Sequence, residues 1–227
     1  MPDESQTDTR RRTRLLQVRT GVVKQLGNGD VLSAIDKAAR DGPVWLGPEG
    51  LEGDEQRERE FHGGADKAAL HYCADHYDRW ALEIPKRTAL FAPGGFGENL
   101  VSRGLDETGV CIGDRIQIGP ALVEVTQPRL PCYKLDIRFD EPTVSALTEQ
   151  NGRSGWYYRV LEPGAVAAGD WIEIVDRPHP DWAVRRVLHL VFDEDVDRDA
   201  GAALLELTDL AAGLRARLTR RLQVGAN

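Results

Sequence analysis

The sequence predicts an α+β protein that is mostly β, built as a barrel or sandwich with one long inserted helix and a small helical C-terminal part. Three observations lead to this fold class. From about residue 15 to 175, short stretches that alternate apolar and polar residues are separated by Gly, Pro and Asp, a pattern that favours many short strands. Residues 65–83 instead repeat their apolar side chains at helical spacing. After residue 178 the pattern is helical again.

The strands follow in order along the chain. Residues 15–23 form the first candidate strand and end before a Gly-Asn-Gly-Asp turn. A Gly-Asp turn precedes the alternating residues 115–118, and a Gly-Pro turn then leads into residues 121–126, which predicts a hairpin. A related Gly-Asp phrase begins residues 169–174. These repeated turns predict a series of half-buried strands.

The helical segments divide the remaining sequence. The long helix over residues 65–83 carries one apolar stripe, and a short helix is expected after Thr143, whose hydroxyl can cap it. Three more helices are predicted at residues 181–189, 197–207 and 209–222, each with an Asp near its start. We therefore expect a disordered tail at residues 1–14, a barrel domain at residues 15–178 and a small α-helical domain at residues 179–227.

Composition limits the class of protein. The net charge of the 227 residues is −8 and the isoelectric point is near 5.2, so a broad nucleic-acid surface is not expected. The arginine run at residues 10–14 is interpreted as part of a solvated tail. No stretch has the roughly 18 apolar residues that span a bilayer. The N-terminus lacks the apolar core of a signal peptide, so a cytoplasmic location is expected.

One cysteine stands out as a candidate reactive group. Cys132 lies in the loop of residues 127–135, which follows a strand and is stiffened by two prolines. Arg129 and Lys134 flank it, and positive charges favour the thiolate that attacks electrophiles or binds metals. The alternative is a structural cysteine in a rigid connector.

Other chemistry-bearing side chains are interpreted more conservatively. Cys73 lies on the apolar stripe of the predicted helix and Cys111 lies between two aliphatic residues, so both are expected in the core. His71 and His76 do not share the spacing of a helical metal pair and are interpreted as surface histidines. The glycine-rich residues 94–100 match neither common nucleotide-binding pattern.

A second candidate site is the segment around a glycine pair. Gly63 and Gly64 precede the predicted long helix, so its backbone donors could approach an anion closely. Lys67 would add a positive charge, and His62 could donate a hydrogen bond or move a proton. The alternative is that the glycine pair is only a hinge.

Taken together, these segments resemble the MOSC family, named after the C-terminal domain of molybdenum cofactor sulfurases. The resemblance is strongest to its YiiM-like branch, which is associated with resistance to N-hydroxylated base analogues such as N-hydroxylaminopurine. It extends from about residue 15 to 175 and rests on five segments in the expected order: residues 50–56, 62–68, 96–100, 127–135 and 155–157.

The resemblance implies a β-barrel that holds a molybdenum–pterin cofactor, with Cys132 as the protein's ligand to molybdenum. Thr20 and Gly21 match another motif near the implied pocket. Asp54 or His62 would handle the proton. The positions that match the family's phosphate-binding residues are His62, Gly63, Gly64, Lys67, Asn99 and Arg129.

The implied activity is a detoxifying two-electron reduction of a small N-hydroxylated base or amine to the parent amine and water. Because the sequence has no iron–sulfur spacing and no nucleotide-binding signature, the electrons would come from a separate flavin or iron–sulfur reductase. Two alternatives stay open. One is sulfur transfer, in which Cys132 carries a persulfide. The other is a non-catalytic carrier that binds molybdopterin and hands it on.

Overall fold

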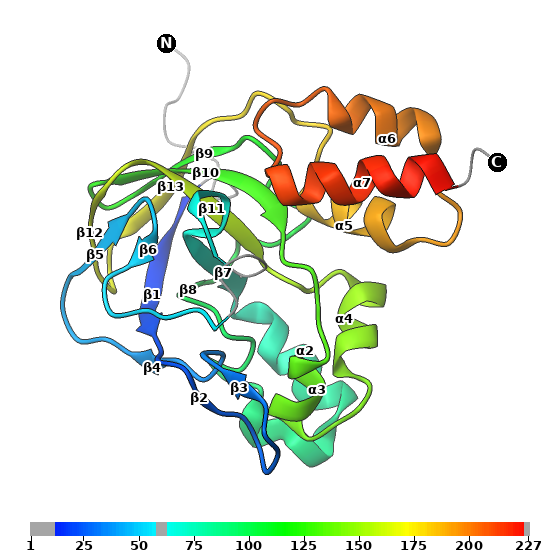
Figure 1. The fold of residues 1–227 in the computed structure, drawn as a ribbon. Helices are drawn as coiled ribbons and strands as arrows, with labels where there is room; N and C mark the ends of the chain where they lie inside the picture. Colours follow the sequence, from blue (N-terminus) through cyan, green and yellow to red (C-terminus); the bar gives the residue numbers. More distant parts are fainter. Residues whose placement is uncertain (1–11, 58–62, 225–227) are drawn as a thin grey trace.

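A seven-stranded β-barrel forms the centre of the molecule (Figure 1). The computed structural model describes residues 12–57 and 63–224. Within them, the barrel strands follow one another in the order β1 (Arg12–Thr20), β8 (Leu100–Ser102), β7 (Ala69–Cys73), β11 (Trp156–Glu162), β10 (Ala121–Pro128), β9 (Arg115–Ile118) and β13 (Trp171–Asp176). Strand β13 pairs back onto β1 and closes the barrel. Only β7 and β8 are parallel among these neighbours. The predicted barrel and its hairpin, β9 with β10, are therefore confirmed.

The seam between β1 and β13 corrects the predicted tail. Arg12 pairs with Glu173 and Arg14 with Trp171 in an antiparallel register. The guanidinium groups of Arg12 and Arg14 also lie over the Trp171 ring, at 3.8 and 3.5 Å from its centroid. The expectation of disorder is thus wrong for residues 12–14, because strand pairing and cation–π contacts hold them. Residues 1–11, with the rest of the arginine run, lie outside the described residues.

Small sheets extend the barrel on one side. Strands β5 (Val44–Gly47), β6 (Gly50–Leu51) and β12 (Gly164–Val166) form a three-stranded antiparallel sheet. The predicted turn after the first strand lies inside a short hairpin. The hairpin consists of β2 (Lys24–Gln25) and β3 (Leu32–Ser33). Strand β4 (Ala38–Ala39) pairs with the end of β1.

The long helix predicted over residues 65–83 is wrong in its first half. A 3₁₀ turn, η1 (Ala65–Lys67), leads into strand β7, and only then does α2 (Asp75–Glu83) begin. All five residues of β7 are buried between β11 and β8. A short, continuously apolar strand has the same periodicity as a buried helix segment, so only the partner strands distinguish the two.

Three short helical elements follow α2 around a second apolar cluster. They are η2 (Pro85–Leu90), α3 (Lys134–Phe139) and α4 (Val144–Asn151). The sequence indicates α4 but not α3. Thr143 is at the N-cap of α4, but its hydroxyl accepts from no helix amide and donates to the Glu141 carboxylate instead. The aromatic rings packed in this cluster belong to Tyr72, Tyr77, Trp80, Phe91, Phe96 and Phe139.

The three C-terminal helices lie where the sequence predicts them. They are α5 (Val184–Phe192), α6 (Arg198–Leu205) and α7 (Ala212–Val224), and they lie side by side next to the barrel in Figure 1. Asp197 caps α6 by accepting from the Ala200 amide. Buried side chains of these helices belong to the same core cluster as the barrel strands. None of the described helices is long and apolar enough to cross a membrane.

Candidate functional site

A cavity of about 640 Å³, including its open mouth, lies beside the loop that leaves β10. Its lining includes more cations than carboxylates, although the chain as a whole has a net charge of −8. The positively charged lining residues are Lys37, Arg57, Lys67, Arg129 and Lys134, and the negatively charged ones are Asp54 and Glu55. The cavity is therefore suited to an anionic ligand.

Cys132 lines this cavity, in the loop between β10 and α3. Its side chain is half-buried, whereas Cys73 and Cys111 are buried in the core. Burial raises the pKa of Cys73 to about 12 and that of Cys111 to about 11, which keeps both as inert thiols. The core interpretation of these two cysteines is confirmed. Cys132 is thus the cysteine that a ligand in the cavity can reach.

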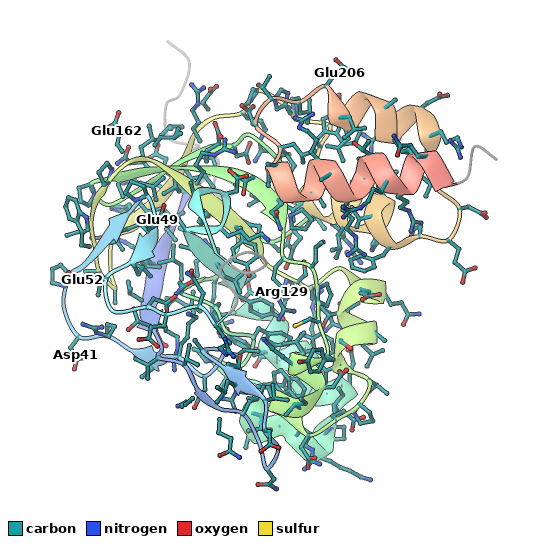
Figure 2. All side chains as sticks on the ribbon, in the orientation of Figure 1. Asp41, Glu49, Glu52, Arg129, Glu162 and Glu206 are labelled. Atoms are coloured by element: carbon teal, nitrogen blue, oxygen red, sulfur yellow. The ribbon has the colours of Figure 1, made fainter. Side chains whose placement is uncertain are left out.

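Arg129 is a deeply buried cation of the site. It is 5% exposed, and its backbone amide donates to the Gly155 carbonyl at 2.9 Å, which fixes the loop at the end of the barrel. Its Nη1 atom is buried and has no hydrogen-bond partner. In Figure 2, Arg129 lies well inside the outline of the molecule, while Asp41 and Glu206 lie at its edge. A buried guanidinium nitrogen without an acceptor is costly, so an anionic oxygen is the natural partner for it.

Lys67 enters the cavity from a turn and not from the start of a long helix. Its amide donates to the Gly64 carbonyl at 2.9 Å, and Gly64 has a φ of 88°. Burial lowers the pKa of Lys67, with the Asp66 carboxylate acting in the opposite direction. Gly63 and Gly64 precede this three-residue turn and not the predicted long helix, and the phosphate contact predicted for them stays a proposal. His62 lies outside the described residues.

Asp54 organises one wall of the cavity. Its side chain is 1% exposed and forms a buried ion pair with Lys37, which is 7% exposed. Its carboxylate also accepts from the Gly21 amide at 2.8 Å and from the Asn99 side-chain amide at 2.9 Å. Burial lowers the pKa of Lys37, an effect that the Asp54 charge opposes. Both oxygens of Asp54 therefore contact protein donors.

Asn99 and Thr20 also face the protein. The Asn99 oxygen accepts from the Leu70 amide at 3.0 Å, and its nitrogen donates to the Arg19 carbonyl and to Asp54. Both of its amide hydrogens are thus used inside the fold. The Thr20 hydroxyl accepts from Arg40 at 2.9 Å. These contacts join β1 to the cavity wall and position the residues that line it.

The structure brings five of the predicted residues to one cavity, namely Asp54, Lys67, Asn99, Arg129 and Cys132. Thr20 and Gly21 lie behind Asp54 and not in the lining. Sequence reasoning missed Lys37, Arg57 and Tyr157. No local signal identifies Lys37, which follows a short hairpin in a segment of ordinary composition.

The interpretation of His71 and His76 as surface histidines is wrong, because β7 and α2 bury both. The His71 ring nitrogens contact the Tyr158 hydroxyl at 2.9 Å and the Ser102 hydroxyl at 2.8 Å. Burial lowers the pKa of His71 to about 3, so its ring is neutral. His76 contacts the Glu107 carboxylate at 2.6 Å.

Comparison with known proteins places this geometry in context. The model of the MOSC domain matches residues 58–173. Protein YiiM of Escherichia coli (strain K12) is 41% identical over 208 residues, which are 92% of this chain and 90% of that protein. The crystal structure of YiiM from Escherichia coli superposes with a TM-score of 0.80 at 34% identity and covers 94% of each chain. YiiM from Geobacillus stearothermophilus superposes with a TM-score of 0.78 at 30% identity, over 92% of this chain and 99% of that one.

A longer relative is also similar. A protein of Gibberella moniliformis named reductase is 41% identical over 201 residues, which are 86% of this chain. Those residues are 36% of the fungal protein, so this chain spans about a third of that relative's length.

Proposed function

The chain belongs to the MOSC domain family, and from this premise we propose that it is a molybdenum-cofactor-binding oxidoreductase that reduces N-hydroxylated bases or amines to the parent amine. One observation carries the proposal. The half-buried thiol of Cys132 and the buried, unpartnered Nη1 of Arg129 share a cavity rich in cations. The relative named reductase supports a reductive reaction.

The residues of the cavity fit such a cofactor. Cys132 would ligate the molybdenum through its thiolate, a soft ligand suited to redox metals. Arg129 and Lys67 would hold the phosphate, since a guanidinium or ammonium group forms strong charge-assisted hydrogen bonds with phosphate oxygens. His62, Gly63 and Gly64 complete the proposed phosphate contacts. When bound, the cofactor would supply two-electron oxygen-transfer chemistry.

The chain's own residues would position the substrate and manage protons. In the proposed reaction the N–O bond breaks, an N–H bond forms, and two electrons and two protons are consumed with release of water. Asp54 holds Gly21, Lys37 and Asn99 in place, which makes it a positioning residue. Proton transfer by Asp54 or His62 stays a proposal. We further propose that a separate flavin or iron–sulfur reductase supplies the electrons.

The test is anaerobic purification from a host that makes the molybdenum cofactor. Molybdenum and pterin would be quantified in the wild type, in Cys132→Ala and in the matched control Cys111→Ala, whose thiol is buried away from the cavity. We expect near-stoichiometric metal and pterin in the wild type and the control, and loss of molybdenum in Cys132→Ala. Arg129→Gln should lose pterin as well. The loaded wild type should reduce N-hydroxylaminopurine with a chemically reduced dye.

Other results would favour the alternatives. Absence of molybdenum and pterin, under conditions that load a known molybdoenzyme, would refute the cofactor proposal. A sulfur adduct on Cys132 in the mass spectrum would then favour sulfur transfer. Bound pterin without reduction of any N-hydroxylated compound, whatever the electron donor, would favour a non-catalytic carrier.

A further inference from the structure

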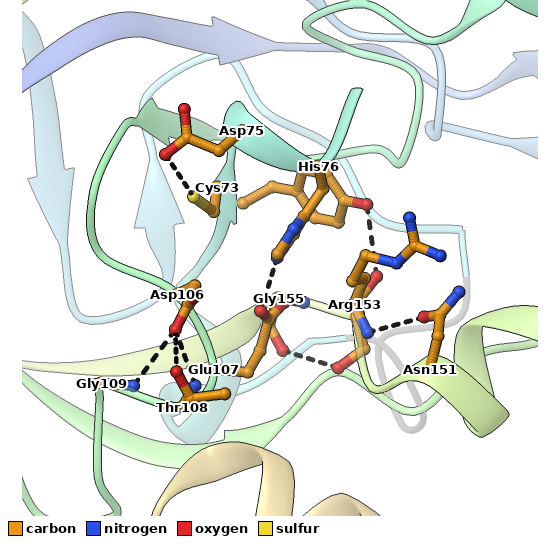
Figure 3. Close-up of polar contacts among 12 residues, drawn as sticks. Cys73, Asp75, His76, Asp106, Glu107, Thr108, Gly109, Asn151, Arg153 and Gly155 are labelled. Carbon is orange, nitrogen blue, oxygen red and sulfur yellow. Dashed lines mark hydrogen bonds and ion pairs between the residues drawn. The ribbon is translucent and has the colours of Figure 1, made fainter. Parts of the chain in front are cut away.

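A second cavity, of about 500 Å³ including its mouth, lies where four segments meet. They are α2, the turn at residues 106–108, the loop at residues 151–153 and the start of α5. Figure 3 shows the polar contacts of this region. The residues described as lining it are all different from those lining the first cavity. A ligand there would therefore occupy a separate site.

The acidic groups of this cavity already have donors. One oxygen of Glu107 contacts His76 Nε2 at 2.6 Å and the other accepts from the Gly155 amide at 2.6 Å. Asp106 accepts from the backbone and the hydroxyl of Thr108 within its own turn (Figure 3). These carboxylates are engaged in holding the walls, so they do not call for a metal ion or another cation.

Several donors of the cavity lack acceptors. Arg153 is 8% exposed, and its Nη2 donates to the Glu83 carboxylate at 2.7 Å while the guanidinium lies over the Trp80 ring. Its Nη1 is buried without a partner. The Asn151 oxygen accepts from the Arg153 backbone amide at 2.9 Å, but the Asn151 Nδ2 is buried without a partner.

Two further cations stand at the mouth. Arg79 on α2 and Arg185 on α5 are exposed and line the cavity. Among the described residues, neither has a carboxylate within ion-pair distance. The site thus combines guanidinium groups with buried N–H donors that have no acceptor. The complementary ligand accepts several hydrogen bonds and carries negative charge.

We propose that this second cavity binds a small oxyanion, a phosphate or carboxylate group. Arg153 Nη1 and Asn151 Nδ2 donate to its oxygens, and Arg79 and Arg185 neutralise its charge at the mouth. Asn151 and Arg153 lie next to each other in Figure 3, as one ligand group requires. This site is independent of the proposed cofactor chemistry, because it uses none of the residues of the first cavity.

The test measures binding of inorganic phosphate and of acetate to the full chain by calorimetry, with chloride used to keep the ionic strength constant. One variant combines Arg79→Gln with Arg185→Gln. A second, Asn151→Asp, keeps the acceptor for the Arg153 amide but replaces the donor by a negative charge. The matched control is Arg186→Gln, because Arg186 is an exposed arginine on α5, next to Arg185, and does not line the cavity. Arg129→Gln separates binding at the first cavity from binding at the second.

We expect saturable binding of at least one of the two anions to the wild type. The double variant and Asn151→Asp should each weaken it by roughly tenfold or more, since each removes at least one charge-assisted contact. Arg186→Gln should keep it within roughly twofold of the wild type. Arg129→Gln removes any phosphate bound in the first cavity and should leave in place the binding component that the double variant loses. Absence of saturable binding, binding that depends on Arg129 alone, or a phosphate-soaked crystal with only water in the cavity would each overturn the proposal. All three results can be read without any cofactor in the first cavity.

Discussion

The buried ion pair between Lys37 and Asp54 allows a sharp test of what holds the first cavity together. Lys37→Met removes the ammonium group and keeps most of the aliphatic volume. Asp54 would then remain 1% exposed without its charged partner, with only the Gly21 and Asn99 donors left to stabilise it. A buried carboxylate that loses its counter-ion is strongly destabilising.

The expected loss follows from burial. Breaking a buried ion pair by removing one partner lowers the free energy of unfolding by about 3–5 kcal/mol. Because Asp54 keeps two hydrogen bonds, the loss for Lys37→Met should lie near the lower end of this range. The matched control is Lys24→Met, whose partner Asp36 is 2.6 Å away but whose side chains are 50% and 44% exposed. An exposed pair contributes about 0–1 kcal/mol, and Asp36 keeps Arg138 at 3.1 Å. The two variants should therefore differ by about 2–4 kcal/mol in the free energy of unfolding.

The assay is urea unfolding of the cofactor-free chain at neutral pH, followed by circular dichroism. The slope of the free energy against urea should stay the same in all variants, so that the midpoints report stability. Adding Asp54→Asn to Lys37→Met removes the uncompensated charge and should restore part of the loss. Equal midpoints for Lys37→Met and Lys24→Met would refute the reasoning, because the burial of the pair would then contribute nothing.

Three further predictions concern other parts of the fold. Burial lowers the pKa of His71 to about 3, whereas in the unfolded chain its pKa is about 6.5. The free energy of unfolding should therefore fall by about 1.4 kcal/mol per pH unit between pH 6.5 and pH 3, because only the unfolded chain binds this proton. Urea titrations at several pH values should show that His71→Phe removes this slope. The methyl group of Gly155→Ala would overlap the carbonyl of His71, whereas at Gly104, which has the same φ of 75°, nothing lies within 4 Å. Gly104→Ala should lower the free energy of unfolding by about 1–2 kcal/mol, and Gly155→Ala should lower it by at least about 2 kcal/mol more. Similar melting temperatures for the two variants would contradict this. Iodoacetamide should label Cys132 quickly, and Cys73 and Cys111 roughly a hundredfold more slowly. Mass spectrometry of the labelled wild type and of Cys132→Ala measures these rates. Fast labelling of Cys132→Ala would show that burial does not protect Cys73 and Cys111.

Local sequence patterns determined much of the fold. Alternating residues after Gly-Asp turns predict β9 and β13, and a Gly-Pro turn predicts the hairpin of β9 with β10. Asp residues before apolar periodic stretches predict the C-terminal helices. These signals depend on neighbours within a few residues, so they can be read without the rest of the chain. The contrast between a loop cysteine, Cys132, and core cysteines could be predicted for the same reason.

Only the tertiary structure decided the features that depend on distant partners. Residues 69–73 form a strand because β11 and β8 pair with them, and this pairing buries His71. Arg12 and Arg14 are ordered because Trp171 lies across the barrel seam. Lys37 becomes a cavity residue through Asp54, 17 positions away. In each case the local sequence is compatible with several environments, and the free energy of pairing and burial with residues far along the chain selects one of them.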